Sequence, residues 1–399
     1  MLTLLFAAIT ISTSFEGGNI GKVETLAPAH LRCAVKGQAD QNNRNRQASW
    51  YYFQLGNLPK REVTIDFVDL AGEYNFKAGT HPVTKNTRPV YSYDQRTWTH
   101  FEDHNVEWDE KELRLTLRFT PGQEKMWIAH IAPYTAADLA RIPSSPFLRR
   151  EVIGKTVKKR DMPLFTVTDP SVPLDSKKVV WVMARQHAWE TGTSWVIDGA
   201  LRFLLSAAPE ADAIRRSTVF KIFPMADPDG VATGAVRFNA NGYDLNRNWD
   251  AIDAQLMPEI AAQRKVMLDW LDSGKRIDLF LALHNTETQD FIEAPLTAGG
   301  TELQAIAHRF QKLLDEQTTF HAPKGPRSSG TTTTPGMKGR MTVYQALLHE
   351  RKVPAFLMEQ MVERSPRLGH PPTVQDRLNF GAALVGVLAN TPAPNQSTK

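Results

Sequence analysis

The chain has 399 residues, a hydrophobic content of 42% and a formal net charge of +4 from 47 basic and 43 acidic residues. A chain of this length can bury two hydrophobic cores. The positive charge is small and dispersed and no nucleic-acid-binding module is recognisable, so we expect no nucleic acid as a partner. Cys33 is the sole cysteine, which excludes a disulfide within the chain. A single cysteine favours neither a reducing compartment, such as the cytoplasm, nor an oxidising one outside it.

The N-terminus is apolar over residues 1–9 and is similar to the hydrophobic region of a signal peptide. It lacks the basic residues and the small-residue cleavage site of such a peptide, and the same residues can instead form a first strand. Residues 1–12 therefore leave two interpretations, and localisation stays open between the cytoplasm and a secreted or periplasmic location. No other segment approaches the roughly 20 apolar residues of a membrane span, so we expect none.

The first part of the chain predicts β structure. Residues 64–70 and 113–119 alternate apolar and polar side chains with period two, as half-buried strands do. We find no recognisable catalytic chemistry in this part. We predict a small antiparallel β-sandwich domain over residues 1–145.

From about residue 150, strand-like runs alternate with helical stretches such as 257–271 and 301–314. This alternation is typical of an α/β fold, in which helices cover a sheet. We predict a second, α/β domain over residues 146–395.

The first chemical motif follows the apolar, strand-length run of residues 179–184. His187 and Glu190 stand in the turn between this run and a helical pattern over 195–205. A spacing of three lets an imidazole and a carboxylate converge on one point. The motif alone is weak, because a His-x-x-Glu tetrapeptide is common by chance.

Two further residues raise its significance. His284 follows the apolar run 277–283, and Glu359 follows the apolar run 353–358. Each alone is more often an ordinary polar residue at the end of a strand. In open parallel sheets, however, ligands bind beyond the carboxyl ends of the strands, so residues at several such ends can meet in one crevice.

Two histidines and one glutamate are a standard ligand set for catalytic zinc, which keeps a fourth position open for water. The sequence thus predicts a mononuclear zinc hydrolase site with His187, Glu190 and His284 as ligands and one Zn²⁺ per chain.

Between these segments lie Asp227-Pro228-Asp229-Gly230, Arg237 and Asp244-Leu245-Asn246-Arg247. The order His-x-x-Glu, Pro-Asp-Gly, Arg, Asp-Leu-Asn-Arg, His, Glu resembles that of the zinc metallocarboxypeptidases, and in particular the cytosolic-carboxypeptidase branch, which is of the deglutamylase type. The similarity continues outside the catalytic half, at residues 15–21, 50–53, 88–92 and 132–135, and spans nearly the whole chain. It implies a mixed, mostly parallel sheet flanked by helices, preceded by a small antiparallel β-sandwich domain.

The resemblance also implies the activity and a role for each residue. The substrate would be a peptide or protein C-terminal tail, hydrolysed at its last peptide bond. Glu359 would act as general base and acid towards the attacking water and the leaving amine. Arg237 would stabilise the oxyanion, Asn246 and Arg247 would bind the terminal carboxylate, and Asp244 would hold the first histidine.

The chain departs from the branch at two places. Ala188 and Trp189 replace the usual Pro-Gly between the first ligands, and Asn285 replaces the glycine after the second histidine. These changes alter the mouth of the site while every ligand is kept. Digestive-type relatives also carry a tyrosine in a loop before the catalytic glutamate, and Tyr344 is the nearest candidate. A core or strand tyrosine is the alternative, so its role stays open and it is not assigned to the site.

A long loop is predicted at residues 321–340, which are rich in Gly, Ser, Thr, Pro, Lys and Arg. Because it precedes Glu359, we expect it to line the entrance. Arg340, or Lys338, can bind an acidic side chain of the last substrate residue, as removal of a C-terminal glutamate requires. A solvated basic loop is the alternative.

Two other functions remain open. One is a zinc amidase or deacylase acting on a small N-acyl amino acid, which would use similar ligands and a similar Asn-Arg pair. The other is a noncatalytic binding protein of the same fold. It would be marked by loss of a zinc ligand or of Glu359, and none is lost.

Overall fold

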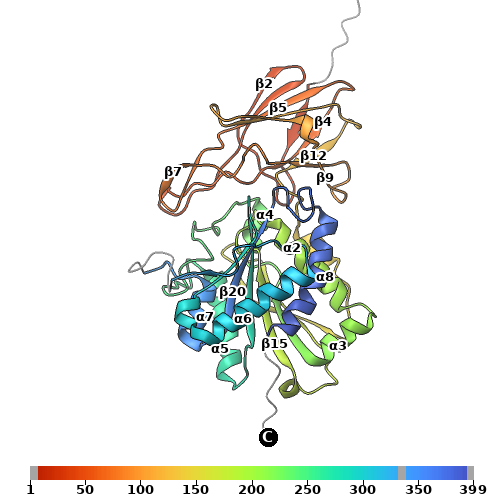
Figure 1. The fold of residues 1–399 in the computed structure, drawn as a ribbon. Helices are drawn as coiled ribbons and strands as arrows, with labels where there is room; N and C mark the ends of the chain where they lie inside the picture. Colours follow the sequence, from red (N-terminus) through yellow and green to blue (C-terminus); the bar gives the residue numbers. More distant parts are fainter. Residues whose placement is uncertain (1–7, 331–337, 393–399) are drawn as a thin grey trace, which may run out of the picture.

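The protein is described by a computed structural model that covers residues 8–330 and 338–392. A strand-rich body formed by the N-terminal residues sits on an α/β body (Figure 1). Most of the apolar run at residues 1–9 lies outside the described residues. The residues that follow it begin the first strand, β1.

Two five-stranded sheets form the strand-rich body. Residues 64–70 and 113–119, predicted as half-buried strands, correspond to β5 and β11, which pair antiparallel with Ile65 opposite Leu117. One pair departs from the antiparallel pattern, because β3 runs parallel to β5. The first sheet has the order β1 (Thr10–Ser12), β4 (Tyr52–Gly56), β12 (Met126–Ala129), β8 (Val90–Ser92), β9 (Thr99–His100), and the second β10 (Val106–Asp109), β11 (Arg114–Phe119), β5 (Val63–Val68), β3 (His30–Ala34), β2 (Val23–Ala27).

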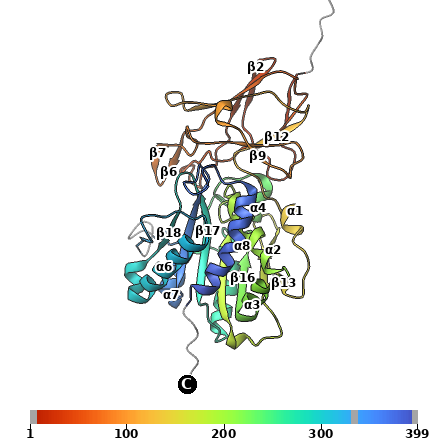
Figure 2. The same cartoon turned by 45° about the vertical axis from the view of Figure 1, so that its right-hand side comes forward.

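A separate two-stranded hairpin, β6 (Gly72–Tyr74) and β7 (Lys77–Thr80), extends from the strand-rich body. Figure 2 shows it at the edge that faces the α/β body.

The α/β body contains one eight-stranded mixed sheet. Its centre, β16, β15, β17 and β20, is parallel, which agrees with the predicted α/β fold. The strand order is β13 (Leu148–Lys155), β14 (Asp161–Val167), β16 (Thr218–Phe223), β15 (Lys178–Ala184), β17 (Leu279–Thr286), β20 (Ala355–Met361), β18 (Phe291–Ala294), β19 (Arg327–Ser328).

Helices cover both faces of this sheet. One core packs β-strand residues such as Val180 and Leu281 against α2, α6 and α8, and the other packs Trp181 and Phe280 against α5 and α7. Because neighbouring strand residues alternate between the two cores, the central strands are apolar on both faces. The helices are α1 (Ala136–Ala140), α2 (Thr191–Leu204), α3 (Pro209–Ser217), α4 (Pro228–Thr233), α5 (Pro258–Asp272), α6 (Leu296–Gln317), α7 (Val343–Arg351) and α8 (Val374–Asn390).

The strands that carry His284 and Glu359 are longer than the apolar runs. Both residues were predicted to stand just beyond a strand, but β17 continues to Thr286 and β20 to Met361. The two strands stay paired through these last residues, so the backbone ladder passes the point where the side chains become polar.

Candidate metal centre and substrate cleft

The first two predicted ligands lie in the turn between β15 and α2. Arg185, directly after the strand, has a left-handed backbone with φ of 60°, which reverses the chain. Its buried guanidinium donates to the carbonyl of Ala188 at 2.6 Å and so holds the turn closed. Glu190 is the N-cap residue of α2. The sequence therefore places both ligands on a rigid connection.

The three predicted ligands converge on one buried point. Nδ1 of His187 lies 2.7 Å from Oε1 of Glu190, and Nδ1 of His284 lies 3.0 Å from Oε2 of the same carboxylate. The ligand atoms all lie within 4.8 Å of one another. The three side chains are almost completely buried.

The outer ring nitrogens are held by hydrogen-bond partners. Nε2 of His187 pairs with Oδ1 of Asp244 at 3.1 Å, and Nε2 of His284 pairs with Oε1 of Gln186 at 3.1 Å. Gln186 is fixed in turn, because its amide donates to the carbonyl of Leu245 at 2.7 Å. With Nε2 engaged, each histidine presents Nδ1 to the centre, as ligand histidines with such partners do.

The cluster fits a zinc ion. Oε2 of Glu190 and Nδ1 of His284 are buried and make no hydrogen bond, although they lie 3.0 Å apart. Burial alone would raise the pKa of Glu190, but the two histidines lower it to about 2, so the carboxylate is ionised. Two imidazole nitrogens and a carboxylate that converge on one buried point are the donor set of a catalytic zinc site.

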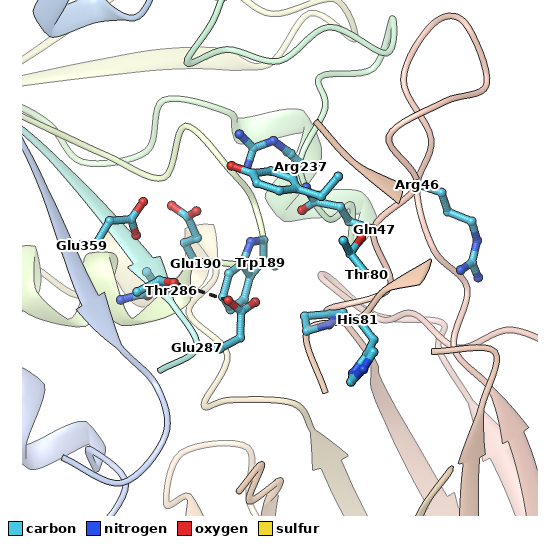
Figure 3. A pocket seen from close by; sticks show the side chains of 13 residues that line it. Arg46, Gln47, Thr80, His81, Trp189, Glu190, Arg237, Thr286, Glu287 and Glu359 are labelled. Carbon is cyan, nitrogen blue, oxygen red and sulfur yellow. Dashed lines mark hydrogen bonds between the residues drawn. The ribbon is translucent and has the colours of Figure 1, made fainter. Parts of the chain in front are cut away.

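Glu359 lies beside the cluster of His187, Glu190 and His284. It lies opposite His284 in the register between β17 and β20, and its Oε2 is buried without a hydrogen-bond partner. Burial, followed by the charges of Glu190 and Glu287, raises its pKa well above the usual range. In Figure 3, Glu190 and Glu359 lie along one wall of a cavity, opposite Thr80 and His81 of the strand-rich body.

Arg237 is held in place from both bodies. Its Nε donates to Oδ2 of Asp244 at 2.8 Å, and burial of the guanidinium is overcome by that carboxylate, which raises the pKa of Arg237. The backbone N–H groups of Val236, Arg237 and Phe238 all donate to the side-chain oxygen of Gln38, at 2.6 to 3.0 Å. The arginine therefore has little freedom to move.

Two cavities open beside these residues and share Gln47, Tyr74 and Arg237. The first, of about 230 Å³, contains Glu190, Glu287 and Glu359. The second, of about 240 Å³, contains Arg247, Lys338 and Arg340. Residues of both bodies line each cavity, so the cleft lies between them.

The residues predicted to bind substrate belong to the second cavity, with one exception. Arg247 and Arg340 line it, whereas Asn246, though adjacent and buried, lines neither cavity. Arg340 comes from the end of the loop predicted at residues 321–340, of which residues 331–337 lie outside the described residues. Tyr344, whose role the sequence left open, is buried in α7 and donates to Glu293 at 2.5 Å, and it lines neither cavity.

Sequence reasoning missed several residues of the site. Gln186 directly precedes His187, so its position next to a ligand was a usable signal. Gln38 and the hairpin residue Tyr74 reach Arg237 from more than 160 positions away in the chain, and no local pattern marks them.

The fold and the buried His-Glu-His cluster are those expected of a zinc metallocarboxypeptidase, and two family models match the chain. The family model for zinc carboxypeptidases matches residues 137–291, and the model for the cytosolic carboxypeptidase N-terminal domain matches residues 11–131. The chain therefore contains a zinc carboxypeptidase domain preceded by a cytosolic carboxypeptidase N-terminal domain.

The curated relatives include cytosolic carboxypeptidase 3 of Mus musculus, 28% identical over 71% of this chain, and cytosolic carboxypeptidase 6 of Caenorhabditis elegans, 27% identical over 66%. These matches span 29% and 59% of the relatives' own lengths. Among the described residues, no helix is both long and apolar enough to cross a bilayer.

Solved structures share the fold over nearly the whole chain. A metallo-carboxypeptidase from Burkholderia cenocepacia superimposes with a TM-score of 0.80 at 22% identity, covering 96% of this chain and 98% of that one. A metallo-carboxypeptidase from Pseudomonas aeruginosa in complex with (2-guanidinoethylmercapto)succinic acid gives 0.80 at 23% identity, covering 95% and 98%. The predicted order of a strand-rich domain before a helix-flanked sheet is confirmed.

Proposed function

We propose that this protein is a zinc-dependent carboxypeptidase that hydrolyses the C-terminal peptide bond of peptides or proteins. The observation that carries the proposal is the convergence of Nδ1 of His187 and Nδ1 of His284 on the two carboxylate oxygens of Glu190, at 2.7 and 3.0 Å, next to Glu359. An N-terminal domain over residues 1–145 and a catalytic domain over 146–395 form the proposed organisation.

Each residue of the proposed site has its own role in peptide-bond hydrolysis. His187, Glu190 and His284 would hold the zinc ion, which would supply an activated water and polarise the scissile carbonyl. Glu359 takes a proton from the attacking water and returns it to the leaving amine. Arg237, held by Asp244, presents positive charge where the oxyanion develops.

The second cavity provides the recognition that makes the enzyme an exopeptidase. Arg247 offers a guanidinium fork for the terminal carboxylate, and the amide of Asn246 beside it adds a further donor. Support for this assignment comes from Arg247 lining the second cavity and from the buried position of Asn246 next to it.

We further propose that glutamate is the preferred terminal residue. Lys338 and Arg340 line the second cavity together with Arg247. Burial and then the like charge of Arg247 lower the pKa of Arg340, so an acidic side chain between them would offset an existing repulsion. Substitution Arg340→Ala tests this assignment: a preference for glutamate over leucine that survives unchanged would reject it.

The function is tested by mass spectrometry of peptides ending in Glu, Lys, Leu or Phe after incubation with zinc-loaded protein. We expect stepwise loss of single C-terminal residues, fastest for Glu. If no peptide is shortened, N-acetylated amino acids such as N-acetylaspartate become the next substrates. Their hydrolysis would indicate the deacylase, and inertness towards both classes would indicate a binding protein.

A further inference from the structure

The tip of the β6–β7 hairpin reaches the substrate cleft from the strand-rich body. Tyr74 lines both cavities, and Asn75 and Phe76 line the second. The hairpin lies beside the α/β body in both views of the fold (Figures 1 and 2). Three consecutive residues of the N-terminal part are thus walls of the cleft.

Each tip residue contacts an arginine of the catalytic part. The guanidinium of Arg237 lies 5.4 Å from the ring centroid of Tyr74. Oδ1 of Asn75 accepts a hydrogen bond from Nη2 of Arg340 at 3.2 Å, and the guanidinium of Arg340 lies 5.8 Å from the ring centroid of Phe76. Aromatic faces and amide oxygens attract and orient guanidinium groups.

The turn between β6 and β7 contains Phe76 at a position that disfavours bulky residues. Asn75 and Phe76 have φ of 47° and 64°, and they are the only residues between β6 and β7. A two-residue hairpin turn with both central φ angles positive favours Asn-Gly, and a bulky residue at the second position is disfavoured. Phe76 is also 44% exposed, so burial does not explain its presence. Such outliers cluster where a residue serves a site.

The hairpin is anchored on its own body. The N–H of Phe76 donates to Oδ1 of Asn45 at 2.9 Å, and the N–H of Glu73 donates to the carbonyl of Arg46 at 2.8 Å. The carboxylate of Glu73 forms an ion pair with Arg44 at 2.5 Å. The strand-rich body therefore determines where the tip lies relative to Arg340.

We propose that Tyr74, Asn75 and Phe76 form a specificity element that holds Arg340 and Arg237 for a substrate with an acidic C-terminal residue. Asn75 and Phe76 orient the guanidinium of Arg340 towards the second cavity, and the ring of Tyr74 covers Arg237 where the two cavities meet. This inference rests on the proposed carboxypeptidase function, and it makes the N-terminal part a component of the substrate site.

The substitution Phe76→Gly tests the element without harming the turn, because it creates the favoured Asn-Gly pair. We expect the ratio of kcat/KM for a peptide ending in Glu to that for one ending in Leu to fall about fivefold, consistent with loss of the cation–π contact with Arg340. The substitution also removes the contact of the ring with Arg44, whose guanidinium lies 4.9 Å from the centroid and which lines neither cavity. The fall should come from a higher KM for the Glu peptide, and circular dichroism should show that the variant is folded.

Two further variants complete the test. Asn75→Gly also suits the turn and removes the acceptor of Arg340, so it should lower the same ratio. Leu113→Gly is the matched control, because Leu113 has φ of 46° in the same strand-rich body and lines neither cavity. We expect it to leave the ratio unchanged.

The outcomes separate the two proposals. Release of neither peptide by the wild-type protein would reject the carboxypeptidase function and the specificity element together. Release of both peptides with equal efficiency by the wild type, or an unchanged ratio in folded Phe76→Gly and Asn75→Gly, would reject only the specificity element.

Discussion

His284 of β17 and Glu359 of β20 are direct register partners across two adjacent parallel strands. Partners in a sheet project their side chains from the same face, so the strand pairing itself sets the proposed acid-base group beside a proposed metal ligand. Glu190 completes the arrangement from the turn before α2, with Oε2 3.0 Å from Nδ1 of His284. The geometry of the reacting groups thus depends on backbone pairing rather than on a mobile loop.

Removing the proposed general base should slow turnover strongly and leave zinc binding intact. We expect Glu359→Gln to lower kcat by about 10²- to 10⁴-fold, since an amide cannot accept the proton. Zinc content should remain one ion per chain, because Glu359 is not a member of the ligand cluster. Peptide-release kinetics and metal analysis on the same preparation check this. A variant that retains more than a tenth of wild-type kcat would contradict the assigned role.

Gln186 should matter for zinc affinity through its hydrogen bond to Nε2 of His284. Gln186→Leu leaves that nitrogen without a partner, so we expect zinc affinity to drop about 10- to 100-fold. Competition with a chromophoric chelator measures the change directly.

Two control variants show whether the loss of zinc affinity comes from the hydrogen bond of Gln186. Gln186→Glu retains an acceptor and should recover much of the affinity. Gln263→Leu removes another buried glutamine, one that donates to the carbonyl of Ala226 instead, and should leave zinc binding alone. Equal affinity losses in the two leucine variants would show that Gln186 acts only through general stability.

Arg237 makes two separate contacts that a simple positive charge would not reproduce, because its Nε donates to Asp244 while its Nη1 lies 3.5 Å from Nδ1 of His187. A lysine cannot make both contacts. We expect Arg237→Lys to reduce kcat/KM by about 10²- to 10³-fold, as loss of an oxyanion donor does, with zinc bound as before. Steady-state kinetics on a Leu peptide provide the measurement, and a loss smaller than tenfold would argue against oxyanion stabilisation.

Asp227 should make stability depend on pH. Its side chain is fully buried, Oδ1 accepts from the N–H of Gly230 at 2.9 Å, and burial raises its pKa to about 8. Between pH 4 and 8 the folded protein therefore keeps a proton that the unfolded chain releases. The contribution of this group to the free energy of unfolding is fully present below pH 4 and is lost as the pH rises towards 8. The free energy of unfolding falls by at most about 1.4 kcal/mol per pH unit over this range.

The substitution Asp227→Asn should remove this dependence, because the amide keeps the cap to Gly230 and does not ionise. Melting temperatures of the variant and the wild type, compared at pH 4.5, 6 and 7.5, should shift steadily in favour of the variant as the pH rises. A difference that stays constant over this range would show that Asp227 is ionised in the folded state.

The sequence predicted the ligand cluster because each ligand follows an apolar run long enough for a strand. It misplaced the ends of two strands, since His284 and Glu359 lie inside β17 and β20. A polar residue that lines a cleft looks the same in a sequence as one that ends a strand. Only the pairing between strands, which a single sequence does not display, separates the two cases.

The contributions of the N-terminal part could not be predicted for a related reason. Gln38 and Tyr74 act on Arg237 through contacts between segments that are far apart in the chain. Neither residue belongs to a chemical motif, and hydrophobic periodicity describes only the strands around them. Their importance follows from the way the two bodies pack, which depends on the whole fold.

The central claim, one zinc ion held by His187, Glu190 and His284 as the agent of peptide hydrolysis, is tested most directly by titrating metal-free protein with Zn²⁺ while C-terminal residue release is measured. We expect the rate to rise linearly and to level off at one equivalent per chain, and Glu190→Gln to show no such rise. Release that proceeds at full rate without metal, or that needs two equivalents, would contradict the mononuclear site.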